Sequence, residues 1–452
     1  VVHRVSPREI RKFCLEYIRE KGQPIQVSDL ILSTTFLNEN NLMGLAPIEL
    51  NFKNHASAEQ YYFFKNTIAK VTPDKVDFIQ HGKFTNYVWS NSVLNFNLTS
   101  ENPFFKITNS ENGADIEVLR NDCMYLNYLI NASRVFWRQE LELQFENSTE
   151  LEKQAYCNAN KFNIAGDFLS DEEKQIQKYH LINKIYAIGY ILHRYKQEDY
   201  SKCIYVMDDT PKDSDEDANG RTGKSVMFKG VDKMLTNRFL IDGKNRNITS
   251  DKHIFHGLTK FNEYIQVDDA DKYLDFKFFY TKITNSIVVN PKNSQPYEIP
   301  FDIAPKIVYI TNYGIPNLTG SDMGRILFVS FSDYYHAKTE GYNEERRISH
   351  DFGGRNLYSD FDSVQWNIFY NFMLQCLQFY LQNRSQEFTA PINNIEINNL
   401  RASMGDNFID WANGYFNEDV FDVFIPRKEI QDDYMQKAGR AAKSPNAFKK
   451  TL

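Results

Sequence analysis

A lysine and a hydroxyl side chain stand together at the end of a short glycine-containing loop. The segment comprises Ala218, Asn219, Gly220, Arg221, Thr222, Gly223, Lys224 and Ser225. An apolar run typical of a buried strand precedes it at residues 203–207, and the pattern predicts a helix after it at residues 226–235. In that setting the loop backbone can cradle a β-phosphate, Lys224 can reach the β- and γ-phosphates, and the Ser225 hydroxyl can bind Mg²⁺. Although Ala218 replaces the usual first glycine, the segment predicts a site for ATP and Mg²⁺.

The residues just before this loop are strongly acidic. Residues 208–217 hold six acids and one lysine. Carboxylates beside a triphosphate would repel it, so we expect this stretch to be a solvated loop that points away from the nucleotide.

Further polar side chains follow two other apolar runs. Asp268 and Asp269 come directly after residues 264–267, and Asn312 closely follows residues 307–310. Phosphoryl transfer needs one carboxylate that holds the metal and a second group that orients the attacking water. We assign the metal to Asp268 and the water to Asp269. An asparagine at the carboxyl end of a central strand can donate a hydrogen bond to the γ-phosphate or the water, and we assign this role to Asn312.

These side chains require an α/β sheet that brings the strand ends together. Four apolar runs, at residues 203–207, 264–267, 307–310 and 326–329, are separated by helical stretches. This order is typical of a parallel sheet covered by helices on both faces. Ser170 and Glu173 form a capping box, and the pattern behind them predicts a long helix at the start of the central domain.

We therefore expect three parts: a mixed α+β region at residues 1–169, an ATPase domain at 170–385 and a helical, winged-helix-like segment at 386–452. The patterns predict helices at residues 7–20, 122–142, 363–382, 427–438 and 444–450, and strands on both sides of a turn at 72–74. The chain begins with Val-Val and no initiator methionine, so we expect it to be part of a longer polypeptide.

Composition and charge limit the classes of function. Of 452 residues, 42% are hydrophobic and 25% charged, which is typical of a soluble globular protein. No apolar stretch is long enough to span a membrane and no signal peptide opens the chain, so we expect a cytoplasmic protein. The five cysteines form no C-x-x-C pair, which argues against disulfides and a zinc site. The net charge of −7 argues against a broad basic face, but leaves room for a few lysines that grip nucleic acid inside a ring.

The order of loop, paired acids, asparagine and then Gly324-Arg325 resembles the superfamily 3 helicases of viruses, phages and plasmids, a branch of the AAA+ ATPases. The resemblance covers residues 203–331. Residues 64–68 and 86–89 are also similar, more faintly, to poxvirus-type primase-helicases. The resemblance implies a AAA+ core, a hexameric ring around single-stranded DNA and ATP at the subunit interfaces. It also implies that Arg325 is an arginine finger for the neighbouring subunit, with Arg346 and Arg347 as less favoured candidates.

Residues 286–299 read as two short strands around a turn at 290–294, with Lys292 at the tip. The resemblance implies that this hairpin lines the channel and that Lys292 grips the DNA backbone; a lysine on an exposed turn is the alternative. His253 and His256 lie close together, but no third ligand is nearby, so we expect ordinary structural histidines and no metal site.

The sequence thus predicts an ATP-dependent replicative DNA helicase, as the helicase part of a phage or mobile-element primase-helicase. Expected partners are single-stranded DNA, further copies of the chain and a primase domain or protein; a phage protein would act in the bacterial cytoplasm. One alternative is an AAA+ initiator that melts origins, or a packaging ATPase. Another is a non-enzymatic DNA-binding assembly factor whose nucleotide only holds the ring together.

Overall fold

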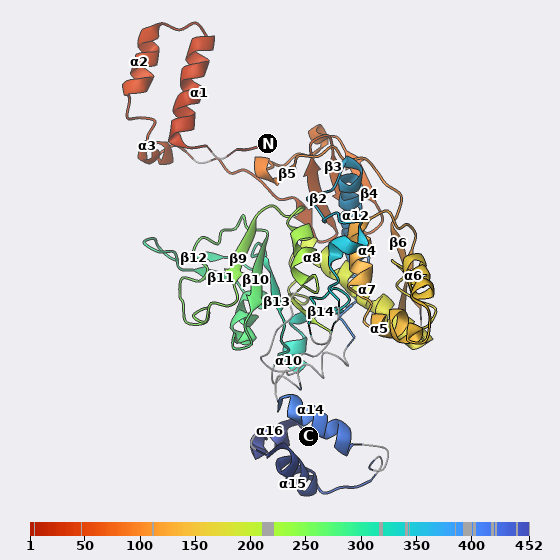
Figure 1. Ribbon diagram of the computed structural model, residues 1–452. Helices are drawn as coiled ribbons and strands as arrows, with labels where there is room; N and C mark the ends of the chain where they lie inside the picture. Colours follow the sequence, from red (N-terminus) through yellow and green to blue (C-terminus); the bar gives the residue numbers. More distant parts are fainter. Residues whose placement is uncertain are drawn as a thin grey trace. The chain divides into compact units, whose positions relative to one another are not determined.

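Helices and strands of the computed structural model are labelled in Figure 1, and the chain divides into two compact units. One comprises Val1–Asn54, Tyr61–Ala69 and Phe78–Asn97, and the other comprises His55–Gln60, Lys70–Asp77 and Leu98–Leu452. The residues that the structure describes are 1–3, 5–46, 48–110, 113–209, 221–315, 320–339, 342, 344–384, 386–391, 400, 404–416, 420, 423–439 and 442–451.

The first unit begins with three helices. They are α1 (Pro7–Glu20), α2 (Ile25–Ser33) and α3 (Glu39–Met43). Ser6 caps α1, and Glu9 completes a capping box, so the helix has the bounds that the sequence predicts. Neither α1 nor α2 has a buried residue.

A small sheet comes next in the chain, and its residues are divided between the two units; its strand order is β1-β2-β3-β4, with β5 beside β2. Its strands are β1 (His55–Ala56), β2 (Glu59–Phe64), β3 (Ile68–Val71), β4 (Val76–Ile79) and β5 (Val93–Leu94). Strands therefore lie on both sides of the turn at residues 72–74, as the sequence predicts.

The second unit contains a five-stranded sheet with the order β14-β8-β13-β10-β9, in which every neighbouring pair is parallel. Its strands are β8 (Cys203–Asp208), β9 (Arg238–Asp242), β10 (Tyr264–Ala270), β13 (Lys306–Thr311) and β14 (Ile326–Phe331). The α/β class with a parallel sheet and the four predicted strands are confirmed. The sequence missed β9, whose residues are mostly exposed or half-buried and give no continuous apolar run. Because the strands are parallel, all their carboxyl ends lie at one edge.

Side chains cover both faces of this sheet. Tyr205, Ile265 and Tyr309 belong to one core cluster that also contains Phe255, Phe276, Phe279 and Ile283 from the segments between β9 and β13. The intervening positions Ile204, Val206 and Val308 are equally buried. Two long helices, α7 (Asp171–Leu192) and α12 (Ser363–Gln382), pack against each other so closely that a Cβ added to Gly189 would lie 2.3 Å from the Cys376 carbonyl oxygen. Ser170 caps α7 as predicted.

The predicted helix at residues 122–142 is wrong as a single helix. The structure has α4 (Met124–Asn131) and α5 (Trp137–Leu141) with a break between them. The Ser133 hydroxyl donates to the Leu129 carbonyl over 2.7 Å, and the Phe136 N–H donates to the Gln177 side chain over 3.0 Å. Side chains thus take the hydrogen bonds that would continue the helix.

The remaining elements of the second unit are shorter. They are β6 (Phe105–Ser110), β7 (Gly113–Val118), α6 (Glu150–Ala159), α8 (Lys224–Val231), α9 (Tyr280–Thr284), β11 (Ile287–Val289), β12 (Tyr297–Ile299), α10 (Gly320–Met323) and α11 (Ile348–Asp351). Helix α8 begins two residues earlier than predicted and ends at Val231, because residues 232–234 form turns.

Three helices near the end of the chain share a core of their own. They are α14 (Asp406–Tyr415), α15 (Arg427–Ala438) and α16 (Pro445–Thr451). Phe408, Trp411, Tyr434 and Phe448 are packed together there. The two predicted C-terminal helices are confirmed, whereas the described residues after 385 contain no strand, so the winged-helix likeness stays a prediction. No helix among the described residues is both long and apolar enough to cross a membrane.

Candidate nucleotide-binding site

The predicted phosphate-site residues meet in one cavity at the carboxyl edge of the large sheet. The cavity has a volume of about 660 Å³, a size that suits a nucleotide. Arg221, Thr222, Gly223, Lys224, Ser225, Asp268, Asp269 and Asn312 all line it. Ala218, Asn219 and Gly220 lie outside the described residues. The structure thus brings together the lysine, the acid pair and the strand-end asparagine from three separate segments.

The Lys224 ammonium is held by three acceptors. It lies 2.6 Å from Asp208 Oδ1, donates to Asn312 Oδ1 over 2.6 Å and donates to the Thr222 hydroxyl over 3.3 Å. The Thr222 hydroxyl itself donates to Asp208 Oδ1 over 2.7 Å. An ammonium has three hydrogens, so these contacts use its full donor capacity.

The predicted solvated loop at residues 208–217 is wrong for its first two residues. Asp208 ends β8 and Asp209 follows it, and both are buried. The Asp209 carboxylate accepts from the Ser330 hydroxyl over 2.8 Å, and its backbone N–H donates to the Phe331 carbonyl over 2.7 Å. These aspartates are therefore part of the sheet edge, where their charges are matched by neighbouring donors.

Three tyrosines hold the first turn of α8. Tyr128 donates its hydroxyl to the Gly223 carbonyl over 2.8 Å, Tyr125 to Met227 over 2.9 Å and Tyr358 to Val226 over 2.8 Å. Burial raises the pKa of all three phenols, so each stays protonated and donates. Gly223, with φ +99°, begins the helix in the left-handed region that favours glycine. The tyrosines fix the backbone that presents Lys224.

The acid pair lies on an irregularity of β10. Pairing with β13 shifts register between Val267 and Ala270, and Asp269 has φ +51°. Gly243 approaches this bulge closely, because its N–H donates to the Asp268 carbonyl over 2.8 Å. A Cβ on Gly243 would lie 2.4 Å from the Ala270 Cα. The bulge turns the two neighbouring carboxylates to different environments.

Asp268 is half-buried and accepts from the Gln266 amide over 3.2 Å, while the exposed Asp269 pairs with Lys244 over 2.5 Å. The Asp269 carboxylate raises the pKa of the Lys244 ammonium above its usual value. The two acids thus lie in different surroundings, Asp268 in the cavity wall and Asp269 on the solvent side. This difference suits the separate roles of holding the metal and orienting the water.

Arginines also line the cavity. Glu345 pairs with both Arg221 and Arg347, and the Arg347 guanidinium, with Arg221 adding to it, holds the pKa of Glu345 below its usual range. The Arg346 guanidinium lies 4.6 Å from the ring centroids of both Trp137 and Tyr334. All three arginines line the same cavity as Lys224, in the same chain. The resemblance had suggested Arg346 and Arg347 only as less favoured fingers for a neighbouring subunit.

Arg325 lies at the opposite edge of the sheet. Its carbonyl accepts from the Cys203 N–H over 2.8 Å, at the amino ends of β8 and β14, and its guanidinium lies 5.6 Å from the Tyr280 ring. A six-residue strand such as β8 spans about 20 Å, so Arg325 does not reach phosphates beside Lys224 of its own chain. Its role at a neighbouring subunit stays a prediction.

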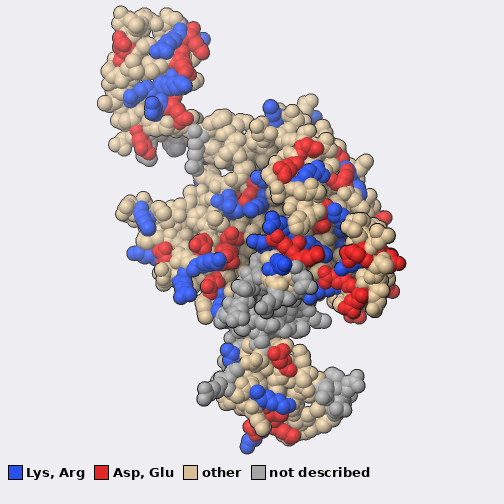
Figure 2. All heavy atoms as spheres, in the orientation of Figure 1, with Lys and Arg blue, Asp and Glu red and all other residues tan. Residues whose placement is uncertain are grey.

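Lys292 lies outside the nucleotide cavity as well. Strands β11 and β12 pair antiparallel with Ile287 opposite Ile299, which confirms the predicted hairpin, and Lys292 is exposed in the turn between them. Lysine, arginine and acidic side chains are interspersed over the face seen in Figure 2. DNA binding by Lys292 stays a prediction.

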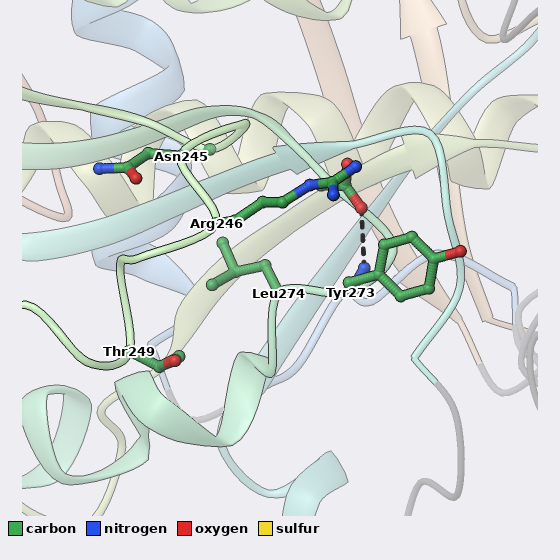
Figure 3. Close-up of a pocket in the computed structure, with 7 residues that line it drawn as sticks. Asn245, Arg246, Thr249, Tyr273 and Leu274 are labelled. Atoms are coloured by element: carbon green, nitrogen blue, oxygen red, sulfur yellow. Dashed lines mark hydrogen bonds between the residues drawn. The ribbon is translucent and has the colours of Figure 1, made fainter.

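A second, smaller pocket follows β9 and β10 (Figure 3). It has a volume of about 400 Å³ and is lined by Gly243, Asn245, Arg246, Thr249, Asp271, Tyr273 and Leu274. The Asp271 carboxylate accepts from the Tyr273 N–H over 2.9 Å and fixes the turn. Neither Lys224 nor the acid pair lines it, so the larger cavity is the candidate nucleotide site.

No family model and no curated protein sequence matches the chain. Among solved structures, it is similar to the apo A form of the NrS-1 C-terminal region, with 13% identity, a TM-score of 0.35 and coverage of 87% of this chain and 91% of that chain. A second structure of that region gives 12% identity and a TM-score of 0.31, with the same coverage. A JCV helicase with a bound acetamide compound gives 11% identity, a TM-score of 0.22 and coverage of 62% and 86%. Each TM-score is below 0.5, so the proposals that follow rest on the residues of this chain.

Proposed function

We propose that the protein is an ATPase that binds Mg-ATP in the Lys224 cavity and uses its hydrolysis to move along DNA. One observation carries the proposal. The Lys224 ammonium, at the start of α8, donates over 2.6 Å to Asn312, directly after β13, inside a cavity that Asp268 and Asp269 also line. A cation, two carboxylates and an amide at the carboxyl edge of a parallel sheet are the groups that phosphoryl transfer needs.

The residues fit both the nucleotide and its metal. Lys224 would exchange its present acceptors for the β- and γ-phosphates, and the N-terminus of α8 adds partial positive charge. The Ser225 hydroxyl and the Asp268 carboxylate are oxygen donors of the kind that Mg²⁺ prefers, and both line the cavity. Bound there, Mg²⁺ would neutralise charge on the phosphoryl oxygens.

The remaining roles concern the attacking water. Asp269 accepts its proton or orients it, and Asn312 donates a hydrogen bond to it or to the γ-phosphate. Lys244 pairs with the Asp269 carboxylate over 2.5 Å. Arg221, Arg346 and Arg347 add positive charge to the wall of the cavity.

For the whole assembly we propose a AAA+ ring of the superfamily 3 type, most simply a hexamer, that encloses single-stranded DNA as the helicase part of a primase-helicase. Arg325 would complete the site of the adjacent subunit. Its place at the sheet edge opposite Lys224 supports a role in trans, because the side chain does not reach the nucleotide of its own chain. Lys292 on the exposed hairpin would contact the enclosed strand.

Unwinding of a forked DNA substrate tests this function. The purified chain, Mg-ATP and a fork with one labelled strand should give released single strand, whereas a Lys224→Ala variant should release none. Turnover of ATP without strand separation would favour an origin-melting initiator or a packaging ATPase. DNA binding without any turnover would favour an assembly factor whose nucleotide is structural.

A further inference from the structure

The turn of the β11–β12 hairpin is tied to the segment that carries His253 and His256. His253 Nδ1 lies 2.7 Å from the Asn290 carbonyl oxygen, and the Lys292 backbone N–H donates to His256 Nδ1 over 3.2 Å. The Tyr297 hydroxyl donates to the Leu258 carbonyl at the base of the same contact. The first residue of the turn, its tip and one strand are therefore fastened to residues 253–258.

The two bonds require different tautomers. A carbonyl oxygen only accepts, so His253 carries its proton on Nδ1. A backbone N–H only donates, so Nδ1 of His256 is unprotonated. His253 thus supplies the donor for the Asn290 carbonyl, and His256 supplies the acceptor for the Lys292 N–H.

The core holds the strands of the hairpin but not its turn. Ile287, Val289 and Ile299 are buried in the core cluster, whereas residues 292–294 of the turn are exposed. The two histidine bonds fasten the turn itself. Asn293, directly after Lys292, has φ +61°, in the left-handed region. Lys292 and His256 are both exposed, so their bond lies at the surface where the lysine would meet a ligand.

We infer that His253 and His256 are positioning residues for the DNA contact of Lys292. They hold the turn so that the lysine ammonium stays extended toward a phosphate of the single strand, instead of moving with a free loop. This inference rests on the proposed function, and it assigns a role to two histidines that neither the nucleotide site nor a metal explains.

Paired substitutions separate this role from simple stability. His253→Ala and His256→Ala remove the bonds, whereas His253→Asn and His256→Asn place an amide nitrogen or oxygen near the former Nδ1. Without DNA, hydrogen exchange of the Lys292 amide should quicken in His256→Ala and stay near the wild-type rate in His256→Asn. Equal exchange in the two variants would overturn the proposed bond.

Binding of labelled single-stranded DNA at several salt concentrations gives the functional readout. The alanine variants should weaken binding. The log–log slope of affinity against salt should flatten by up to about 0.7 for each phosphate that the protein no longer binds, so the loss of affinity between 50 and 200 mM salt should become about threefold smaller. The asparagine variants should keep most of the wild-type slope. Lys12→Ala, which removes an exposed lysine of α1, controls for the change in net charge that the Lys292→Ala substitution causes.

A double-mutant cycle decides where the histidines act. In a Lys292→Ala background, the alanine substitutions at the histidines should weaken binding no further. The same weakening in both backgrounds would mean that they act elsewhere, and wild-type binding by Lys292→Ala would remove the hairpin from the DNA contact; either result overturns the inference and leaves the ATPase proposal standing. If the wild-type protein binds no single strand, the proposed function itself fails.

Discussion

Replacing Asp208 by Asn should tighten the binding of ATP. Asp208 is buried at the end of β8, and its carboxylate lies 2.6 Å from the Lys224 ammonium. All three ammonium hydrogens have acceptors within the chain, so a phosphate has to displace at least one of them. The Asn variant keeps the shape of the side chain and an acceptor for Thr222, but removes the charge that competes with the phosphates.

The size of the effect follows from the hydrogen bond that ATP would have to break. A hydrogen bond between charged groups contributes about 1.5–3 kcal/mol, and about 1.4 kcal/mol corresponds to a tenfold change in affinity. If ATP displaces Asp208 from Lys224, the variant avoids this cost and binds roughly 10- to 100-fold more tightly. Removal of a carboxylate near the phosphates acts in the same direction.

Titration with a fluorescent ATP analogue in the presence of Mg²⁺ measures the affinity. Asp209→Asn is the matched control, since Asp209 is the adjacent buried aspartate and its carboxylate bonds to Ser330. Its affinity should be close to that of the wild type. Weaker or unchanged binding by Asp208→Asn, in a variant that folds as shown by circular dichroism, would refute the reasoning. It would mean that Asp208 and Lys224 stay paired when the nucleotide is bound.

Three other predictions concern the nucleotide site, the assembly and the fold. Asp269→Asn should bind ATP but stop hydrolysis, because Asp268 still holds the metal while the water is no longer oriented; full turnover would pass that role to another acid that lines the cavity, such as Glu345. Arg325→Ala should bind ATP normally and lose roughly three to five orders of magnitude in turnover, and mixing it with Lys224→Ala should restore some activity through one intact interface. No rescue in an assembled mixture would remove the shared site. Gly189→Ala should lower the free energy of unfolding by about 1–3 kcal/mol in chemical denaturation, because its Cβ would overlap the α12 backbone; wild-type stability would contradict the α7–α12 packing.

The sequence was informative where local order alone determines the structure. Strands β8, β10, β13 and β14 are buried on both faces, so each leaves a largely apolar run, which in β10 includes the buried Gln266. The capping box of α7 consists of two residues only three positions apart, Ser170 and Glu173. The phosphate loop is a contiguous segment as well. The places of Lys224, Asp268 and Asn312 in one cavity could therefore be predicted from strand order and sheet geometry.

The contacts that the sequence did not reveal join residues far apart in the chain. Tyr125 and Tyr128 bind the α8 backbone about one hundred residues later, and nothing near them marks this role. Asp208 stands in an acid-rich stretch whose composition suggests a solvated loop, yet strand pairing buries it. His253 and His256 lack a metal-ligand pattern, and their partners lie 37 and 36 residues away.

Direct binding of Mg-ATP by the wild-type chain and its Lys224→Ala variant tests the central claim most directly. Lys224 is the main cation that would face the β- and γ-phosphates, and it lies within the cavity that the acid pair also lines. The claim predicts that the wild type binds Mg-ATP saturably and hydrolyses it at a measurable rate. A folded Lys224→Ala variant should neither bind nor hydrolyse it. Wild-type affinity in Lys224→Ala would contradict it and place the nucleotide, if any, elsewhere on the protein.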